Sequence, residues 1–396
     1  MRTIFAGRSS MAQKKRNLIH VIYKNGTIST LDLCTLCHLN IVTAYRLLDS
    51  LASEGLIKVL RDNKNQNVGR PSNLITVNPE YLYLLTIHIQ RTMATIALVD
   101  FSNHIVQRED VPLLTIDSPE QLLTKLEKIY PVLLRKQEIQ DEKIAGIGIS
   151  CIGPLDKSQG ILLSPPFFSH LWDNYPIVEN VEKRFHKNAI LDFNICSATM
   201  GRYANGRMPK NEKLAYIIID EGIGAAVVLN AKIIEGNSRT VLSLAHTTVN
   251  INGKKCRCGK YGCIELYASK TAILEAALLE IKLGKKSSLQ EYGDNLTFEH
   301  ICKAVLDKDR IAESIIENAA AYFSIGLCNY VSNLDINTVY LGGSVVIQCP
   351  MYFNFVYGRL QELIPELKVH LEENLSDQIL KGISTKYLIH KLFESL

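Results

Sequence analysis

The stretch Asn252–Glu265, NGKKCRCGKYGCIE, places three cysteines within eight positions, whereas the other seven cysteines of the 396-residue chain are scattered. The cysteine spacing is C-x-C-x4-C, and a histidine lies ten residues before the first of the three. Gly259 and Gly262 let the chain turn tightly enough for the thiolates to converge. Three sulfurs and one imidazole form a set that tetrahedral zinc takes in structural sites, and a redox switch using two of the thiols is the alternative. The expected zinc ligands are His246, Cys256, Cys258 and Cys263.

The composition sets the class of protein. A chain of 396 residues that is 47% hydrophobic is long enough for two or three domains with ample cores. No run approaches the roughly 18 apolar residues that a membrane span needs, and residues 1–10 lack the apolar segment of a secretory signal. We therefore expect a cytoplasmic protein without a membrane partner. In that reducing compartment, closely spaced cysteines indicate metal ligands or redox groups rather than disulfides.

The charge is unevenly distributed along the chain. Residues 1–80 contain 11 Lys and Arg against 5 Asp and Glu, a net charge of +6, whereas the rest of the chain has a net charge of −2. A basic end attached to a nearly neutral body is typical of an appended nucleic-acid-binding unit, because phosphate contacts supply most of the non-specific affinity.

The first 80 residues predict three short helices followed by a β-hairpin. Apolar residues recur at helical spacing in KKRNLIHVIYKNG, and Gly26 follows where a left-handed residue is needed. STLDLCTLC begins with a capping serine or threonine, and Asn40 can cap a third helix. In that third helix one apolar stripe faces inward, so Thr43, Tyr45 and Arg46 project elsewhere. The stripe consists of Ala44, Leu47, Leu48 and Leu51.

Two β-prone runs, LIKVL and NLITV, flank the basic stretch RDNKNQNVGRPS. Three helices and a hairpin predict a winged helix-turn-helix, whose third helix fits the major groove of double-stranded DNA while the wing meets phosphates or the minor groove. A small helical protein-interaction domain is the alternative. The candidate DNA-binding residues are Thr43, Tyr45, Arg46, Arg61, Lys64 and Arg70.

From Tyr81 onward the pattern changes to alternating strands and helices. The strand-like runs LYLLTIHIQRTMATIALVD, KIAGIGISCIG, AILDFNI, LAYIIIDEGIGAAVVLN and INTVYLGGSV are interleaved with helical segments. Such alternation predicts an α/β body of two lobes with a ligand cleft. The expected domains are 1–78 for the DNA-binding part, 79–195 for the first lobe and 196–396 for the second lobe with the zinc site.

Several segments resemble one known family. LAHTTVNINGKKCRCGKYGCIELYAS (244–269) is similar to the zinc segment of the ROK family, which groups bacterial sugar-responsive repressors with sugar kinases. GRPSNLITVNPE resembles the end of the DNA-binding part of those repressors, and GIGISCIGPLD and YLGGSV resemble two further segments of their body. The resemblance covers nearly the whole chain. It implies a two-lobed actin-like body of the hexokinase type, with a ribonuclease H-like fold, a sugar in the cleft, and a homodimer or homotetramer.

The segments that the family's kinases use for catalysis are altered here. Their Asp-x-Gly-x-Thr loop corresponds to HIQRT, with His88 for the aspartate and Gln90 for the glycine, and their Gly-Thr-Gly-x-Gly loop corresponds to DEGIG (220–224). Two carboxylates in the second loop would repel polyphosphate. The resemblance places Asn194 at the position of the catalytic aspartate, and an amide cannot act as a general base. We therefore expect a protein that is not an enzyme.

The sugar-binding set is also changed. In the family, two glutamates, the zinc-ligand histidine and an Asn-Asp pair bind the sugar hydroxyls, and Ser243 stands where the first glutamate belongs. A serine has a shorter reach and less charge than a carboxylate. The effector is therefore expected to differ from a plain hexose, and a phosphorylated or acidic sugar would suit the lost carboxylates. A pocket that no longer binds a ligand is the alternative. The candidate ligand-binding residues are Asn194, Ser243, His246 and Glu265.

These expectations combine into one interpretation. The chain is expected to be a transcriptional regulator, a repressor of sugar-related genes, that senses a sugar or sugar derivative and binds a DNA operator as a homo-oligomer. Zn²⁺ would hold the pocket residues rather than take part in chemistry. One alternative is a ROK sugar kinase with an added DNA-binding part. The other is a DNA-binding protein that is indifferent to metabolites.

Overall fold

The computed structural model describes residues 11–61, 73–166, 168–204, 213–229, 232–234 and 244–393. The chain forms two compact units. The first comprises Met1–Met208 together with Ser376–Leu396, and the second comprises Pro209–Leu375.

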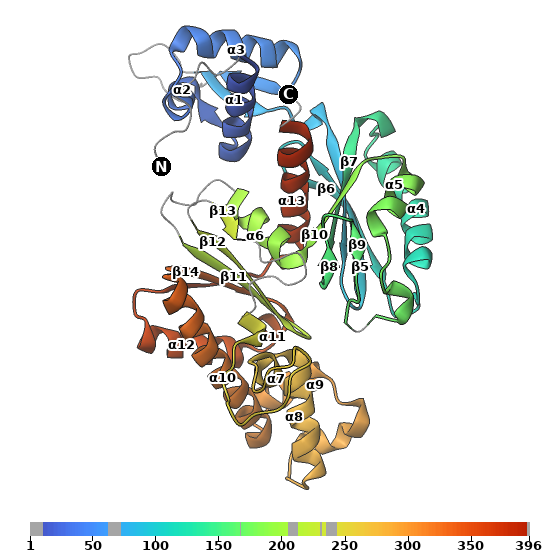
Figure 1. The fold of residues 1–396 in the computed structure, drawn as a ribbon, viewed down its shortest axis with the longest axis vertical. Helices are drawn as coiled ribbons and strands as arrows, with labels where there is room; N and C mark the ends of the chain where they lie inside the picture. The colour runs from blue at the N-terminus through green and yellow to red at the C-terminus, as the bar shows by residue number, and fades with distance from the viewer. Residues whose placement is uncertain are drawn as a thin grey trace. The chain divides into compact units, whose positions relative to one another are not determined.

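The N-terminal part of the first unit, residues 11–77, is called the head below. It contains the helices α1 (Met11–Asn25), α2 (Thr30–Cys37) and α3 (Ile41–Ser53) and the strands β1 (Ile28–Ser29), β2 (Ile57–Arg61) and β3 (Asn73–Val77). The strands form an antiparallel sheet in the order β1-β3-β2 (Figure 1). The three helices and two of these strands were predicted from the sequence.

Local sequence signals fix the helix ends of the head. The side chain of Ser29 accepts the N–H of Asp32 and caps α2, and the side chain of Asn40 accepts the N–H of Thr43 and caps α3. His38, with φ 52°, ends α2 in the left-handed conformation. Gly26, with φ 69°, follows α1 as predicted. Only three residues, 38–40, therefore separate α2 from α3.

The rest of the first unit is built on a five-stranded sheet in the order β10-β7-β4-β5-β6. Strands β4, β5 and β6 form an antiparallel meander, β7 pairs with β4 in parallel, and β10 pairs with β7 in parallel. Their bounds are β4 (Tyr83–Ile89), β5 (Met93–Asp100), β6 (Ile105–Pro112), β7 (Ile144–Cys151) and β10 (Ala189–Phe193), with the short hairpin β8 (Leu155–Asp156) and β9 (Ile161–Leu162).

Helices cover both faces of this sheet. Figure 1 shows α4 (Pro119–Lys136) and α5 (Ile177–Phe185) on one face and α13 (Leu375–Tyr387) on the other. Helix α6 (Asn194–Ala204) follows β10 directly. Glycines allow α13 to approach closely, because a methyl group at Gly148 would meet Ile383 at 2.8 Å and one at Gly382 would meet the carbonyl of Ser197 at 1.7 Å.

The second unit contains a sheet of the same design. Its strands are β11 (Leu214–Ile219), β12 (Ile223–Leu229), β13 (Lys232–Ile234), β14 (Thr338–Gly342) and β15 (Lys368–Leu371), in the order β13-β12-β11-β14-β15. Again three consecutive strands are antiparallel, and two later strands join in parallel. The two units therefore repeat one topology.

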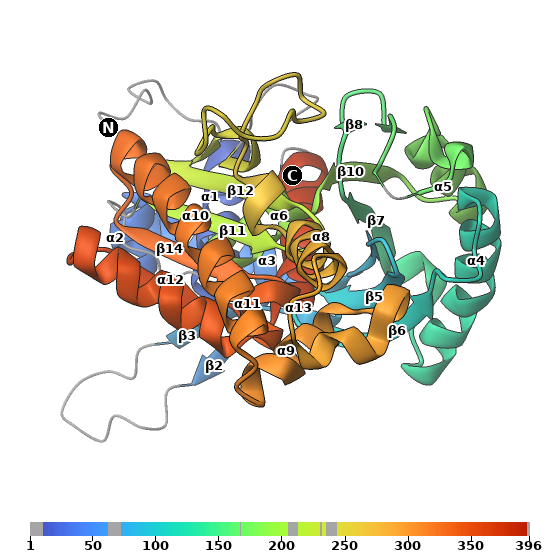
Figure 2. The same cartoon turned by 90° about the horizontal axis from the view of Figure 1, so that it is seen from below.

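The helices of the second unit are α7 (Glu265–Ala268), α8 (Lys270–Lys282), α9 (Phe298–Leu306), α10 (Arg310–Leu334), α11 (Ser344–Gln348) and α12 (Pro350–Leu363). Figure 2 shows α10 and α12 running side by side. Their apolar faces pack with the strands into one core that includes Phe323, Tyr352 and Ile217. The α/β alternation predicted from the sequence is confirmed in both units.

The observed units differ from the domain limits expected from the sequence. Residues 1–78 and 79–195 lie in one unit, that unit extends to Met208, and it also contains Ser376–Leu396. The reason is packing, because Leu84, Phe101 and Tyr387 share one apolar core with Leu18 and Ile22 of the head. Periodicity along the chain carries no signal for such a return, so the limits 1–78, 79–195 and 196–396 stay predictions.

None of the helices in the described part of the chain combines the length and apolar character needed to cross a bilayer.

Candidate functional sites

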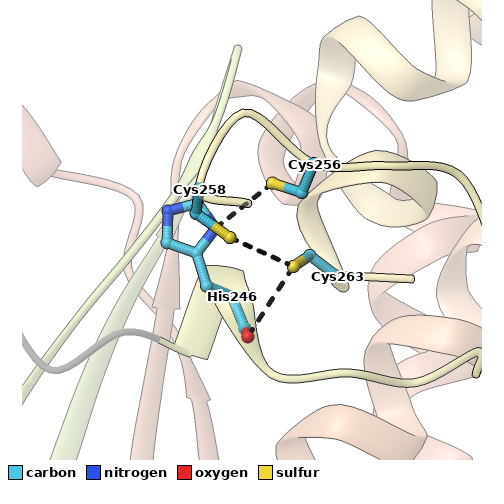
Figure 3. Close-up of side chains that lie close together, drawn as sticks. All are labelled: His246, Cys256, Cys258 and Cys263. Carbon is cyan, nitrogen blue, oxygen red and sulfur yellow. Dashed lines mark hydrogen bonds between the residues drawn. The ribbon is translucent and has the colours of Figure 1, made fainter. Parts of the chain in front are cut away.

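The predicted metal ligands converge in the second unit. His246 Nδ1 lies 3.6 Å from Cys256 Sγ, and Cys258 Sγ lies 3.6 Å from Cys263 Sγ (Figure 3). One ligand atom from each of the four residues lies within 4.8 Å of all the others. The cluster can therefore hold a metal ion.

The spacing matches a tetrahedral divalent ion. Metal bonds of about 2.3 Å to sulfur and 2.0–2.1 Å to nitrogen place neighbouring ligand atoms roughly 3.6–3.8 Å apart around a tetrahedron. Two of the separations, both 3.6 Å, are in this range, and the others are no longer than 4.8 Å. The donor set, three sulfurs and one imidazole, also fits such an ion chemically. It leaves no coordination position for a substrate.

The backbone of the metal loop, defined as residues 246–265, is folded by short-range hydrogen bonds. The N–H of Cys256 donates to the carbonyl of Lys260 at 2.7 Å, and isolated bridges pair Lys255 with Tyr261 and Thr248 with Cys263. Gly262 adopts φ 64°, and a methyl group there would lie 1.6 Å from the Asn250 carbonyl oxygen. Only glycine fits at that position.

Burial and nearby charges shift the pKa values of three members of the cluster. Burial lowers the pKa of His246, the Glu265 carboxylate acts against this shift and Arg257 supports it, and the neutral imidazole is the form that binds metal. Burial would raise the pKa of Cys258, but hydrogen bonds from the Lys260 backbone and the other thiols lower it. Burial and hydrogen bonds to the two other cysteines raise the pKa of Cys263 to about 12, so a bound cation would have to displace the proton of that thiol.

Glu265 joins the metal loop to the altered phosphate loop. Its Oε2 accepts the N–H of Ile223 at 3.2 Å, and its Oε1 accepts from Arg257 Nη2 at 3.2 Å, with its side chain 14% exposed. Gly222 lies beside this carboxylate, because a methyl group at Gly222 would be 2.8 Å from it. The metal loop therefore supports the loop at residues 220–224.

The carboxylates of that loop have partners within the second unit. Asp220 Oδ1 accepts the N–H of Ser344, the first residue of α11, at 2.5 Å. Burial raises the pKa of Asp220, although the hydrogen bond from Ser344 acts against it. Glu221 lies 3.7 Å from Lys270 Nζ. The backbone N–H of Ser344 is therefore already hydrogen-bonded to the Asp220 carboxylate.

The segment HIQRT (88–92), which the resemblance aligns with Asp-x-Gly-x-Thr, begins with a buried histidine. His88 is 1% exposed, and its Nδ1 lies 3.2 Å from Gln90 Nε2. Burial and the nearby charge of Arg108 lower the pKa of His88 to about 3. A neutral imidazole enclosed in the sheet replaces a carboxylate at this position.

The predicted ligand-binding residues are divided between the units. Asn194 begins α6 in the first unit, and its Oδ1 accepts the N–H of Ile195 at 2.8 Å. His246 and Glu265 lie in the second unit. Ser243 lies outside the described residues.

The head presents one exposed face on α3. Tyr45 and Arg46 are exposed and Thr43 is half-buried, while the predicted stripe of Ala44, Leu47, Leu48 and Leu51 is buried. The side chain of Arg61, and Lys64 and Arg70 as whole residues, lie outside the part of the chain that the structure describes.

Two exposed residues of α3 were missed in the sequence. Val42 is 76% exposed and Ile41 is 41% exposed, directly after the Asn40 cap. Both are apolar and lie off the buried stripe. Their position off the stripe was the signal in the sequence that they could be exposed. An exposed apolar pair at the start of this helix extends the candidate DNA-binding face.

Comparison with curated proteins finds repressors. The chain is 25% identical over 347 residues to the DNA-binding transcriptional repressor Mlc of Escherichia coli K12, which covers 87% of this chain and 84% of Mlc. It is 26% identical over 327 residues to the xylose repressor of Caldicellulosiruptor bescii, covering 82% and 81% of the two chains.

Comparison with solved structures gives the fold. A crystal structure of a ROK family transcriptional regulator, a homologue of the E. coli MLC protein, matches with a TM-score of 0.77 and 19% identity over 97% of this chain and 99% of its own. A ROK hexokinase from Thermus thermophilus matches with a TM-score of 0.64 and 21% identity over 78% and 99%. The body thus has the α/β fold of the ROK sugar kinases.

The family model covers most of the body. The model described as ROK family matches residues 84–375, well over half of the chain. This range includes both sheets, the altered phosphate loop and all four residues of the metal cluster. The chain therefore belongs to the ROK family.

Proposed function

We propose that this protein is a DNA-binding transcriptional repressor that responds to a sugar or sugar derivative and does not phosphorylate it. Two repressors, Mlc and a xylose repressor, each align over more than four fifths of the chain. The head separates such regulators from the hexokinase. The solved structure of the ROK regulator matches 97% of this chain, whereas that of the ROK hexokinase matches only 78%.

The single observation that carries the proposal is the geometry of α2 and α3. A three-residue turn joins two capped helices, and α3 exposes Tyr45, Arg46 and Val42 opposite its buried stripe. Together with the β2–β3 hairpin, this arrangement supports a winged helix-turn-helix, in which the second helix of the motif enters the major groove. The operator is double-stranded DNA.

The altered loops support the absence of kinase activity. Asp220 occupies the Ser344 N–H, and two carboxylates stand where the kinases of the family bind polyphosphate. Asn194 supplies no base for the sugar hydroxyl. Three independent changes, at residues 88–90, 220–221 and 194, act against phosphoryl transfer.

The metal cluster has a structural role in this proposal. Zn²⁺ would be held by His246, Cys256, Cys258 and Cys263, and its closed ligand shell would fix the metal loop without activating a substrate. The loop in turn positions Glu265, which contacts the backbone of Ile223. Metal binding therefore stabilises the second unit and the ligand-binding residues that it carries.

The effector is proposed to be a sugar derivative. Ser243 replaces one carboxylate of the family's set and Asn194 replaces another, so an anionic sugar would meet less repulsion here. Isothermal titration with neutral hexoses, phosphorylated sugars and acidic sugars tests this proposal. A preference for neutral hexoses would refute the anionic class, and no binding by any sugar would favour a metabolite-independent DNA-binding protein.

The function is tested by recovering DNA. Purified protein is mixed with fragmented genomic DNA, bound fragments are sequenced, and the affinity for the enriched site is measured with and without each sugar. We expect a palindromic site with half-sites about one helical turn apart, bound by a homodimer or homotetramer. Recovery of no enriched sequence would contradict the proposal.

Arg46→Ala tests the face of α3. Loss of one side chain that contacts DNA should weaken operator binding about 5- to 150-fold, the range expected for one direct base contact. The control is Arg135→Ala, an exposed arginine on α4 whose Nε donates to the Pro131 carbonyl. Equal affinities of both variants for the operator would show that α3 is not the recognition helix.

A sugar kinase with a DNA-binding head is the second candidate, because ROK kinases share the fold of the body. The coupled assay for ADP release, run with a panel of hexoses and amino sugars, separates the two. Turnover of ATP would establish the kinase and overturn the proposed inactivity.

A further inference from the structure

Helix α13 contacts both the head and the sheet of the first unit. Near its C-terminal end, Thr385 Oγ1 lies 3.0 Å from the hydroxyl of Tyr23 on α1. The Thr385 hydroxyl donates to the Lys381 carbonyl, so the Tyr23 hydroxyl is the donor to Thr385. Figure 1 shows α13 extending from the five-stranded sheet to the head.

The next residue along α13, Lys386, contacts the five-stranded sheet rather than the head. Lys386 Nζ forms an ion pair with Asp192, and the two side chains are 7% and 2% exposed. Asp192 lies on β10, two residues before Asn194 at the start of α6. Lys157, from the β8–β9 hairpin, lies 3.3 Å from the other carboxylate oxygen of Asp192. A buried charge pair thus ties α13 to the strand that leads to Asn194.

The surface between α13 and the sheet is unusually polar. Strand pairing places His88, Ser150 and Asp192 side by side on one face of β4, β7 and β10. All three are buried, and the Ser150 and Ser384 hydroxyls have no hydrogen-bond partner among the described residues. Unsatisfied buried hydroxyls reduce the stability of this arrangement, although Gly148 and Gly382 keep α13 in close contact with its neighbours.

Neighbouring residues of a helix cannot move independently. Thr385 and Lys386 are one residue apart, so a rotation or translation of α13 that alters the Asp192 contact also alters the Tyr23 contact. Thr385 is also tied to the five-stranded sheet, because Asn103 Nδ2, in the turn between β5 and β6, donates to Thr385 Oγ1 at 3.2 Å. Any change at β10 therefore has a short route to α1.

We propose that Lys386 and Thr385 are positioning residues that couple the segment carrying Asn194 to the DNA-binding head. Effector contact at Asn194 shifts Asp192, the ion pair moves α13, and the Thr385–Tyr23 hydrogen bond moves α1. This inference rests on the proposed function, in which an effector reaches Asn194 and the head binds DNA. It adds the path by which effector binding at Asn194 would change DNA binding by the head.

The first experiment needs neither DNA nor a sugar. Hydrogen exchange of the full-length protein is compared between wild type, Lys386→Met and the double variant Asp192→Asn/Lys386→Met, which leaves no uncompensated charge of that pair. We expect amide exchange in α1 to become at least threefold faster in both variants. Lys187→Met is the control, because Lys187 forms a more exposed ion pair with Asp141 at 2.9 Å in the same unit. Unchanged exchange in α1 in the double variant would overturn the proposal.

The second experiment measures coupling. For each variant the operator affinity is determined with and without effector, and the effector affinity is determined without DNA. In Lys386→Met and in Tyr23→Phe the factor by which effector weakens operator binding should fall at least fivefold, while effector affinity alone changes less than threefold. Lys386→Arg, which keeps the charge, should restore part of the factor. An unchanged factor in both variants would refute the link.

The two failures can be distinguished. If the wild-type protein binds no operator, the proposed function is wrong, while the exchange measurement still decides whether the ion pair controls α1. If the wild-type protein responds to effector and the exchange of α1 in both variants equals that of Lys187→Met, the proposed function holds and the path through α13 is wrong.

Discussion

Asp220 and Cys258 are single residues on which the proposed function of the body depends. The Asp220 carboxylate accepts the Ser344 N–H at 2.5 Å, in the loop that the resemblance aligns with a phosphate loop of the family's kinases. Cys258, whose pKa is lowered by hydrogen bonds although burial acts against them, belongs to a group of four side chains that could hold a metal ion. Under the proposed function, Asp220 opposes polyphosphate and Cys258 supports a metal.

Cys258→Ser tests the metal at this scale. Serine is a poor zinc ligand, so the metal content should fall from about one ion per chain, and the second unit should lose much of the stability that metal binding contributes. Metal analysis by mass spectrometry and thermal unfolding check this result. Cys328→Ser, at a half-buried cysteine outside the cluster, should keep both values. Full metal content in Cys258→Ser would contradict the assignment.

At the scale of elements, turns and caps hold the functional segments. The metal loop depends on two glycines with positive φ, and only one of them also touches neighbouring backbone. Gly262 would bring a methyl group within 1.6 Å of the Asn250 oxygen, whereas at Gly259, with φ 91°, nothing lies within 4 Å. An alanine at Gly262 would therefore combine backbone strain with a steric collision, whereas an alanine at Gly259 would add backbone strain alone.

Gly262→Ala should destabilise the second unit more than Gly259→Ala. Both variants require an L-residue at positive φ, which costs about 1–2 kcal/mol, but Gly262→Ala must also displace the Asn250 backbone. We expect Gly262→Ala to lose metal and Gly259→Ala to retain most of it. Metal content and urea unfolding check the difference. Equal losses would show that strain, rather than the close contact, controls the loop.

The cap of α10 predicts a dependence on pH. Partial burial acts in the opposite sense, but hydrogen bonds from Ser288, Ala312 and Ser287 lower the pKa of Asp309 to about 2. Because this folded-state pKa is below the ordinary value, the ionised carboxylate stabilises the fold above about pH 4 and loses that effect as the pH falls toward 2.

Asp309→Ala should therefore cost about 1–2 kcal/mol near neutral pH, the range for an N-cap, and the difference from wild type should shrink between about pH 4 and pH 2. Urea unfolding of both proteins across this pH range measures the difference. A difference that stays constant down to pH 2 would show that the charge of Asp309 makes no contribution.

For the whole molecule, charge and function are divided along the chain. Residues 1–80 have a net charge of +6, whereas the remainder has a net charge of −2. Operator binding should therefore depend steeply on salt. With about six phosphate contacts, affinity should fall on the order of a thousandfold between 50 and 200 mM salt. Fluorescence anisotropy with labelled operator checks this dependence, and an affinity insensitive to salt would argue against phosphate contacts by the head.

Much of the site could be predicted from sequence because its signals are local. The spacing of Cys256, Cys258 and Cys263 indicated one metal centre, and the structure brings all three to His246. The three helices of the head, its strands β2 and β3 and the buried stripe of α3 followed from periodicity and caps, whereas the two-residue strand β1 did not. Val42 and Ile41 were not assigned to either face in the sequence, although both lie off the predicted stripe and are exposed.

What the sequence determined by itself is the chemistry that neighbouring residues can perform together: the metal loop, the charged phosphate loop, the basic head and the alternating elements of the body. What only the tertiary structure decided are contacts between residues far apart in the chain. The ion pair of Lys386 with Asp192 spans 194 residues, and the hydrogen bond of Tyr23 with Thr385 spans 362. No periodicity records such pairs, because they form where the chain, after the residues of the second unit, returns through α13 to pack on the first unit.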